Sequence, residues 1–253
     1  MNVKELYAKF NEKIPAALSE SWDNDGIMCC ADGSQEISKV LVTLDVTEEI
    51  VDFAISSHFD LIVSHHPLIF RPLSSVTEDN NVSRKIIKLL GNGVSVFSFH
   101  TRLDKVAGGV NDQLAELIGI YDTVPFGEGF LGRIGNVDEK MELEDFVYKL
   151  KLTIGADMIK YSDAFNTVDR VAVVGGDGKD YVRAAIEAGA DTFISGRISY
   201  NMMEEAAEMG INLIEAGHYF TEHPVTEYIR ELITDFDPAI NVEIAPSNVI
   251  KII

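Results

Sequence analysis

Six histidines are few for a chain of 253 residues, and their placement is the first indication of function. Three short apolar runs are each followed by a histidine, and at two of these places an acidic residue comes four positions later. Neutral imidazole and carboxylate are ligands of borderline and hard divalent ions, and neither cysteine is near these positions. We therefore expect a divalent metal site. Its candidate residues are His65 and His66, His100 with Asp104, and His218 with Glu222.

The adjacent pair His65 and His66 bears on the number of ions. Side chains on consecutive residues of an extended segment point in opposite directions, so the pair is a poor chelator of one ion. Each histidine could instead hold one of two neighbouring ions, with Asp104 or Glu222 as a bridge. Two such ions stabilise both the attacking and the leaving oxygen of a hydrolytic step. A single histidine of this kind is more often a packing or capping residue, but three such positions together favour a metal centre.

Alternating strand and helix patterns indicate how these residues are positioned. Short β-branched runs alternate with longer segments of helical period, which is typical of βαβ units with mostly parallel sheets, so we expect an α/β fold. Each candidate site follows the carboxyl end of a predicted parallel strand, where open α/β sheets bind ligands. The predicted strands cover residues 40–45, 61–64, 94–99, 171–174, 192–195 and 211–215. The predicted helices cover residues 48–57, 83–90, 110–118, 141–152, 181–188, 201–208 and 226–233.

The order of elements repeats because the sequence does. A shift of 131 residues pairs residues 40–64 with residues 171–195 without a gap, and seven of these 25 positions are identical. Internal similarity of this kind predicts two related lobes. We expect the first lobe at residues 1–124 and the second at 125–253, with the metal site between them and the last helix as a candidate to pack back on the first lobe. Residues 67–80 exceed the matching loop of the second half and are a candidate insertion at the site.

The composition excludes several classes of protein. The chain has 41 acidic and 21 basic residues and a net charge of −20, which repels phosphate backbones and anionic lipid, so we expect no nucleic-acid partner and no membrane surface. No uncharged apolar run approaches the ~20 residues of a spanning helix, and the first ten residues lack the apolar stretch of a signal peptide. Two adjacent cysteines cannot stabilise a fold of this size through disulfide bonds. We therefore expect a cytoplasmic globular protein.

Five short motifs together resemble a known family. They are SWDNDG at residues 21–26, VSHHP at 63–67, HTRLD at 100–104, GGVND at 108–112 and GHYFTE at 217–222. In this order and combination the chain resembles the short form of the GTP cyclohydrolase I type 2-like family, also called the NGG-interacting-factor-three-like family. The resemblance implies a two-lobe α/β fold, a dinuclear metal site and a ring-shaped homo-oligomer, usually a hexamer. The donor types suit Zn, Fe or Mn as the two divalent ions.

The resemblance also assigns roles to individual residues. His100 matches the motif histidine of the family, and we expect it either to face the substrate or to lie behind the metal ligands, where it could transfer a proton or donate a hydrogen bond to a ligand carboxylate. Arg102 stands where the family usually has asparagine; it could pair with a phosphate or carboxylate of the substrate, or it could be an exposed residue at a helix start. Trp22 and Arg197 are further candidates for contacts to a substrate. The implied metal ligands are His65, His66, Asp104, His218 and Glu222, with Glu222 as the bridge.

Two functions from different classes fit these residues. The first is a metal-dependent hydrolase that acts on a nucleotide-like or heterocyclic small molecule, with His100 moving a proton and the ions holding the developing charge. If the family name applies, the reaction opens the imidazole ring of GTP and releases formate. The second is a non-catalytic metal-binding protein that stores, delivers or senses metal, or a regulatory partner protein. Turnover of a nucleotide by the metal-loaded protein distinguishes the two.

Overall fold

A computed structural model describes residues 1–252 of the chain, which form two compact units. Unit 1 combines Met1–Val106 with Thr226–Val249, and unit 2 consists mainly of Ala107–Val225. This division lies before the boundary that the sequence suggested near residue 125, because that residue is inside a strand, Ile120–Phe126, which pairs with Gly132–Met141 in the second sheet. The last helix and the last strand belong to unit 1.

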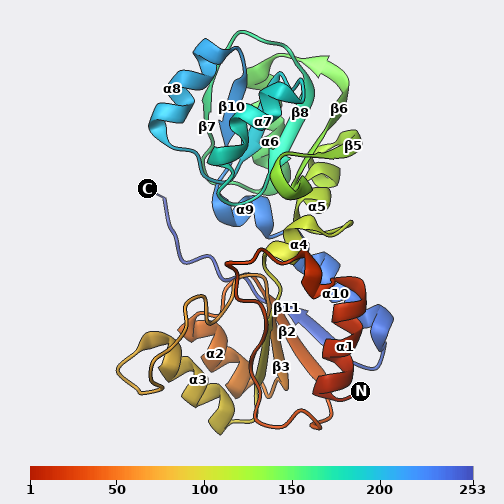
Figure 1. Ribbon diagram of the computed structural model, residues 1–253, viewed down its shortest axis with the longest axis vertical. Helices are drawn as coiled ribbons and strands as arrows, with labels where there is room; N and C mark the ends of the chain where they lie inside the picture. The colour runs from red at the N-terminus through yellow and green to blue at the C-terminus, as the bar shows by residue number, and fades with distance from the viewer. Residues whose placement is uncertain (253) are drawn as a thin grey trace. The chain divides into compact units, whose positions relative to one another are not determined.

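Within residues 1–252, the sheet of unit 1 has five strands in the order β1-β4-β3-β2-β11 (Figure 1). Neighbours from β4 to β11 run parallel, and β1 is antiparallel at the edge. β3 and β4 are buried along their whole length, which explains their near-continuous apolar sequence. The elements of unit 1 are α1 (Val3–Lys13), η1 (Ala16–Leu18), β1 (Gly26–Cys29), β2 (Lys39–Thr43), α2 (Glu48–Ser56), β3 (Leu61–Ser64), α3 (Asn81–Gly91), β4 (Ser95–Ser98), α4 (Thr101–Lys105), α10 (Val225–Phe236) and β11 (Asn241–Ile244).

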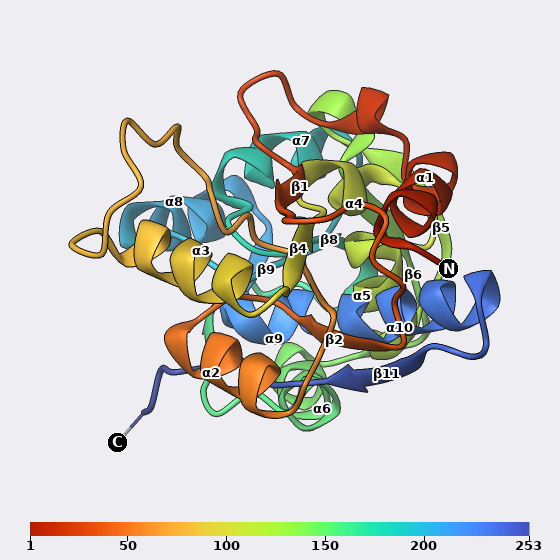
Figure 2. The same cartoon turned by 90° about the horizontal axis from the view of Figure 1, so that it is seen from below.

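Helices cover both faces of this sheet. On one face, Ile50 of α2 and Ile86 of α3 join Ile62 of β3 in one buried cluster. On the other face, the ring of Tyr7 in α1 lies 5.2 Å from that of Phe97 in β4. Figure 2 shows α2 and α3 on one side of the strands and α1 with α10 on the other. Unit 1 is therefore a three-layer α/β unit.

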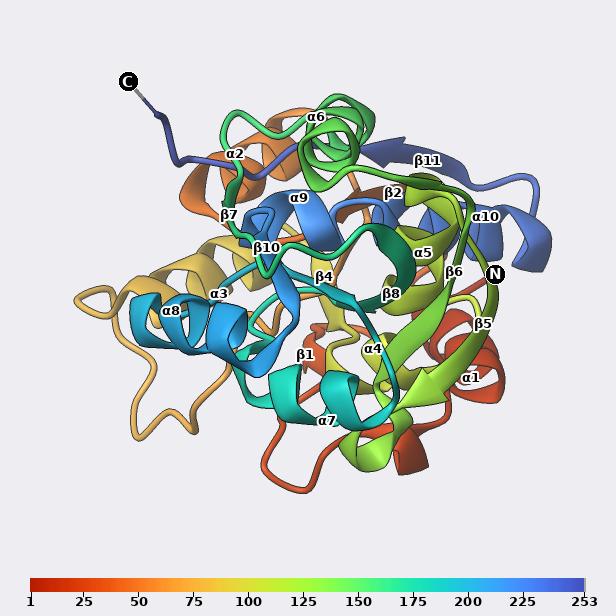
Figure 3. The same ribbon diagram turned by 90° about the horizontal axis from the view of Figure 1, so that it is seen from above.

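Unit 2 has a second sheet, which has six strands among the described residues, in the order β5-β6-β8-β9-β10-β7. β8, β9 and β10 run parallel, whereas β5, β6 and β7 are antiparallel additions at its sides. α5 and α6 pack on one face and α7 and α8 on the other (Figure 3). The elements are α5 (Val110–Ile118), β5 (Ile120–Phe126), η2 (Glu128–Phe130), β6 (Gly132–Met141), α6 (Leu143–Ile154), β7 (Lys160–Ser162), β8 (Val168–Val174), η3 (Lys179–Tyr181), α7 (Val182–Glu187), β9 (Thr192–Ser195), α8 (Tyr200–Met209), β10 (Asn212–Glu215) and α9 (His218–Glu222).

The predicted α/β class, with parallel strands at the centre of both sheets, is confirmed. The antiparallel pairing at the sides of the second sheet was not predicted, because it depends on tertiary contacts rather than on a local pattern. No helix in residues 1–252 combines the length and the apolar character that crossing a membrane requires.

The internal repeat has a structural counterpart in strand register. β2 pairs with β3 so that Val40 lies opposite Leu61, and β8 pairs with β9 so that Val171 lies opposite Thr192. The shift of 131 residues found in the sequence therefore preserves the register of two parallel strand pairs. The connecting helices, α2 and α7, occupy matching places in the two repeats.

Asp60 and Asp191, one of the identical pairs in the repeat, make the same contacts in both units. Each carboxylate accepts hydrogen bonds from two consecutive backbone N–H groups at the neighbouring parallel strand, at 2.6 to 3.1 Å. These bonds satisfy amides that the sheet leaves without a ladder partner, which explains why an acidic residue recurs there. The amides belong to Ser38 and Lys39 in unit 1 and to Asp169 and Arg170 in unit 2.

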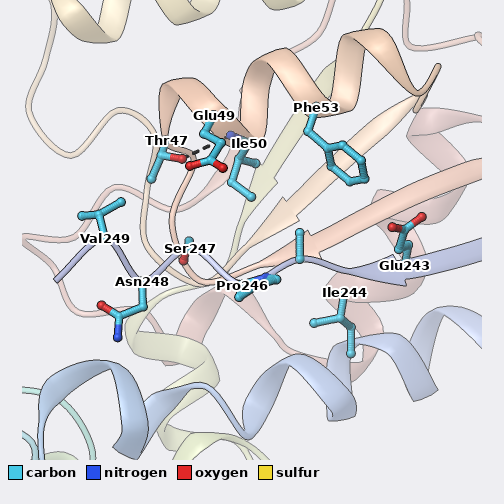
Figure 4. A pocket seen from close by; sticks show the side chains of 11 residues that line it. Thr47, Glu49, Ile50, Phe53, Glu243, Ile244, Pro246, Ser247, Asn248 and Val249 are labelled. Atoms are coloured by element: carbon cyan, nitrogen blue, oxygen red, sulfur yellow. Dashed lines mark hydrogen bonds between the residues drawn. The ribbon is translucent and has the colours of Figure 1, made fainter. Parts of the chain in front are cut away.

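The chain that follows β11 crosses unit 1 next to α2. A hollow of about 290 Å³ lies between them, with Ile50 and Phe53 of α2 on one side and residues 243–249 on the other (Figure 4). The side chain of Thr47 caps α2 by accepting a hydrogen bond from the backbone N–H of Ile50 at 3.2 Å. Ser247 also lines this hollow, and it contacts the candidate site described below.

Candidate metal centre

Three histidine side chains of unit 1 lie together at the carboxyl ends of β3 and β4. His65 and His66 follow β3, His100 follows β4, and one ligand atom of each lies within 4.8 Å of the other two. The ring centroids of His65 and His66 are 4.9 Å apart. The expectation that these two side chains point apart is wrong, because the extended strand ends at Ser64 and the chain bends at both histidines.

All three imidazoles are held through the same ring atom. In each ring Nδ1 contacts a carbonyl or carboxylate oxygen, which can only accept, so Nδ1 carries the proton and Nε2 holds the lone pair of the neutral ring. Metal-ligating histidines are oriented in this way by a backbone carbonyl or carboxylate. The donor set therefore fits a divalent ion. The acceptors are the Phe99 carbonyl for His65 (3.0 Å), the Asp45 carboxylate for His66 (2.8 Å) and the Asp23 carboxylate for His100 (2.8 Å).

The short helix α4 brings a carboxylate to this cluster. Oδ1 of Asp104 lies 3.7 Å from Nε2 of His65. The start of α4 is fixed by Asp23, whose carboxylate accepts hydrogen bonds from the backbone N–H and the hydroxyl of Thr101 at 3.0 and 2.6 Å. Imidazole and carboxylate together suit Zn, Fe or Mn.

The contact between Asp23 and His100 shifts the pKa of both groups. Burial alone would raise the pKa of Asp23, but hydrogen bonds from His100 and Thr101 outweigh it and hold the pKa below its ordinary value. Burial alone would lower the pKa of His100, but the bond to Asp23 and the charge of Asp104 outweigh it and raise the pKa. Asp23 is thus an anion that keeps His100 in one orientation.

In unit 2, His218 and Glu222 lie at the two ends of the five-residue helix α9, which follows β10. Residues four apart share one side of a helix, and Nε2 of His218 is 3.0 Å from Oε2 of Glu222. The turn after β8 comes close to this helix at two glycines, Gly175 and Gly176. A Cβ on Gly176, where φ is +67°, would overlap Oε1 of Glu222. Gly176 thus leaves room for the Glu222 carboxylate.

The guanidinium of Arg102 is fully buried inside unit 1, so the alternative of an exposed residue at a helix start is wrong. It donates hydrogen bonds to Oδ1 of Asn11 at 2.7 Å and to the Ile14 carbonyl at 3.1 Å. It also lies 3.2 Å from the Asp25 carboxylate and 4.6 Å from the centre of the Phe99 ring. The guanidinium therefore binds groups inside the protein and holds α4 in place, and it is not available to a substrate phosphate.

The other two candidate substrate contacts are exposed side chains. Trp22 is 61% exposed, and its ring centroid lies 6.2 Å from that of His100. Arg197 follows β9 in unit 2, and its side chain is 74% exposed, 4.0 Å from the Asp177 carboxylate. Both positions are accessible to a small molecule within their own units.

Three residues that orient the histidines were not identified from the sequence. Asp23 lies in the SWDNDG motif, but nothing in its spacing indicates His100 as its partner. Asp45 comes two residues after β2, at the same sheet edge as His66, and this position was the available signal. The hydroxyl of Ser247 donates to Oδ2 of Asp45 at 3.2 Å and accepts from its backbone N–H at 3.1 Å. A segment about 200 residues away thus holds the partner of His66.

We expect Asp45→Ala to lower the affinity for a divalent metal by about 10- to 100-fold, because His66 loses the acceptor that fixes its ring. Competition with a chromophoric chelator measures this. Asp52→Ala is the matched control, since the Asp52 carboxylate binds Lys88 on the surface of unit 1 at 2.8 Å. Equal affinities for the two variants would show that Asp45 does not orient a ligand.

Two α/β units with histidine and carboxylate side chains after the carboxyl ends of parallel strands define an α/β protein with candidate metal-binding groups. The chain belongs to the Duf34/NIF3 (NGG1p interacting factor 3) family, whose model matches residues 1–252. This confirms the family that the sequence motifs indicated.

Relatives and solved structures agree with this assignment. The chain is 34% identical over 242 residues to a protein of Clostridium perfringens named GTP cyclohydrolase 1 type 2 homolog, covering 93% of this chain and 92% of the relative. It is 33% identical to the protein of the same name from Lactococcus lactis, and the match covers 96% of this chain and 95% of the relative. The crystal structure of Staphylococcus aureus hypothetical protein SA1388 superposes with a TM-score of 0.87 at 27% identity, covering 98% and 97%. Reduced HcgD from Methanocaldococcus jannaschii gives a TM-score of 0.85 at 26% identity, covering 96% and 97%.

Proposed function

We propose that this protein is a dinuclear metal-dependent hydrolase that acts on a nucleotide-like or heterocyclic small molecule. One observation carries the proposal: His65, His66 and His100 lie together, and each has its Nδ1–H bonded to a carbonyl or carboxylate oxygen. A packing histidine needs no such common arrangement. Metal-binding histidines have it, because it fixes the tautomer that presents Nε2.

The proposal includes two ions, of Zn, Fe or Mn, because imidazole and carboxylate donors suit these metals and the family resemblance implies a dinuclear site. Unit 1 supplies imidazoles with the nearby Asp104, and unit 2 supplies the pair on α9. The proposed ligands are His65, His66, Asp104, His218 and Glu222, with Glu222 as the bridge.

The residues around the ligands have defined tasks in this proposal. When bound, divalent ions polarise the substrate and stabilise the negative charge that develops during hydrolysis. His100 is the proposed proton-transfer residue: Asp23 holds its Nδ1–H, so Nε2 is the atom that exchanges a proton with the substrate.

The names of the relatives point to GTP as the first substrate to test. The corresponding reaction is hydrolytic opening of the imidazole ring of GTP with release of formate. A chain of charge −20 repels a triphosphate at long range, so local cations are required. Arg197 is the proposed side-chain contact, because its guanidinium is exposed, whereas Arg102 is buried among protein partners.

We expect protein loaded with Zn²⁺, Mn²⁺ or Fe²⁺ to convert GTP or a related nucleotide, with products identified by mass spectrometry. Glu222→Ala should lower the rate by at least about 100-fold, since it removes the proposed bridging ligand. Glu227→Ala is the control, because Glu227 pairs with Arg230 on α10. Absence of turnover with every metal and nucleotide, together with rapid transfer of bound metal to an acceptor, would favour the non-catalytic metal-binding protein instead.

We further propose a cytoplasmic homo-oligomer, a hexameric ring as the family resemblance implies. Unit 2 exposes large apolar side chains that contacts between copies of the chain would cover. They include Tyr121 and Val124 on the edge strand β5 and Tyr148 and Leu152 on α6.

A further inference from the structure

Two large aromatic side chains are exposed beside the histidine cluster of unit 1. Trp22 is 61% exposed and Phe70 is 47% exposed. Their ring centroids are 6.2 Å apart, and each ring meets His100 nearly edge to face, at 6.2 and 6.1 Å. Trp22, Phe70 and His100 form an aromatic corner. Burial of such side chains is favourable, so their exposure next to a candidate active site calls for a functional explanation.

The aromatic corner is built from two loops that are tied to each other. Trp22 precedes Asp23, which binds both His100 and Thr101. The side-chain amide of Asn24 donates a hydrogen bond to the carbonyl of Ile69, next to Phe70. The loop of Phe70 is the insertion at residues 67–80, which the second repeat lacks. The two rings are thus positioned by polar contacts rather than by packing alone.

We propose that Trp22 and Phe70 bind the planar heteroaromatic ring of the substrate and place it against His100. This inference rests on the proposed hydrolase function, and it identifies the ring, rather than the phosphates, as the main source of affinity. Aromatic side chains stack on any flat π system, so they bind a nucleobase-like ring without requiring positive charge. This property suits a protein of charge −20, which gains little from long-range attraction of anions.

The chain offers a direct test, because Trp22 is its single tryptophan. Stacking of a ring on the indole should quench the intrinsic fluorescence, excited at the red edge of the tryptophan band where guanine absorbs little. We expect saturable quenching by guanosine and GTP with dissociation constants within a few-fold of each other, and none by inorganic triphosphate. Phe70→Leu should weaken binding of guanosine by about 10-fold or more while it keeps the reporter. Trp22→Leu, measured by calorimetry, should weaken binding similarly.

Phe165→Leu is the matched control, since Phe165 is 93% exposed in unit 2, and its guanosine affinity should equal that of the unaltered protein. Quenching by triphosphate alone, or unchanged affinity in Phe70→Leu, would overturn the inference. So would a lack of quenching by all of guanosine, a pterin and a pyridine nucleoside. These outcomes do not depend on turnover: ring binding without any hydrolysis contradicts the proposed function alone, and metal-dependent hydrolysis without ring binding contradicts this inference alone.

Discussion

Substitution of His66 by asparagine is expected to lower the metal content of the protein from about two divalent ions per chain to about one or fewer. His66 supplies one of the three oriented imidazoles of unit 1, and an amide is a much weaker ligand for these ions than imidazole is. The measurement is elemental analysis of protein purified without chelators. His66 keeps partial solvent contact, so the substitution should leave the core of the unit intact.

His58→Asn is the matched control for this experiment. His58 lies after α2 with a backbone φ of +57°, a conformation that asparagine tolerates, and it is outside the histidine cluster. Its metal content should equal that of the unaltered protein. If both variants retain all their metal, or if the unaltered protein contains none, the proposed metal centre is wrong.

Arg102→Met is expected to destabilise unit 1 by about 3–5 kcal/mol, the usual effect of removing one partner of a buried ion pair. Methionine occupies much of the same volume, but it leaves the carboxylate of Asp25 in a largely buried position without its cation. Urea denaturation followed by circular dichroism measures the loss. Arg197→Met, on an exposed arginine, should change stability by less than about 0.5 kcal/mol.

The same variant should show a distinct pH dependence. Burial already raises the pKa of Asp25 above its ordinary value, and the charge of Arg102 opposes that shift. Without Arg102 the pKa rises further, so the folded state binds a proton that the unfolded state releases. The deficit relative to the unaltered protein should therefore be smallest at low pH and grow as pH rises past the pKa of Asp25 in the folded, unaltered protein, where the variant still holds its proton. Adding Asp25→Asn to Arg102→Met should remove most of this pH dependence; a deficit that is independent of pH would show that lost packing, not the unpaired carboxylate, is its cause.

The elements that local patterns specify were predicted closely. The strands at residues 61–64 and 192–195 and the helix at 110–118 have the predicted bounds, because apolar runs and clear end signals coincide there. The helix α1 was missed, although Asn2 and Glu5 form a capping box at its start. The strands β1, β7 and β11 lie at sheet edges and are short, so only their tertiary pairing makes them strands.

The sequence predicted that the candidate site lies at the strand ends, but it did not predict which residues contact one another there. The positions of His65, His66 and His100 followed from the rule that ligands bind at the carboxyl ends of parallel strands. The orientation of His66 did not, because it depends on Asp45 and, through it, on Ser247 far along the chain. Arg102 illustrates the same limit. Its charge favoured an exposed or substrate-facing side chain, and only the packing around α4 shows that it pairs with the buried carboxylate of Asp25.

Unit 1 consists of two stretches of chain, and most of unit 2 lies between them in the sequence. During synthesis on the ribosome, the nascent polypeptide therefore completes the second sheet before β11 has emerged from the exit tunnel. Until β11 docks, β2 is an edge strand that is open to wrong pairing. Ser247, which binds Asp45, is made after β11, so the carboxylate that orients His66 gains these hydrogen bonds only in the same late step.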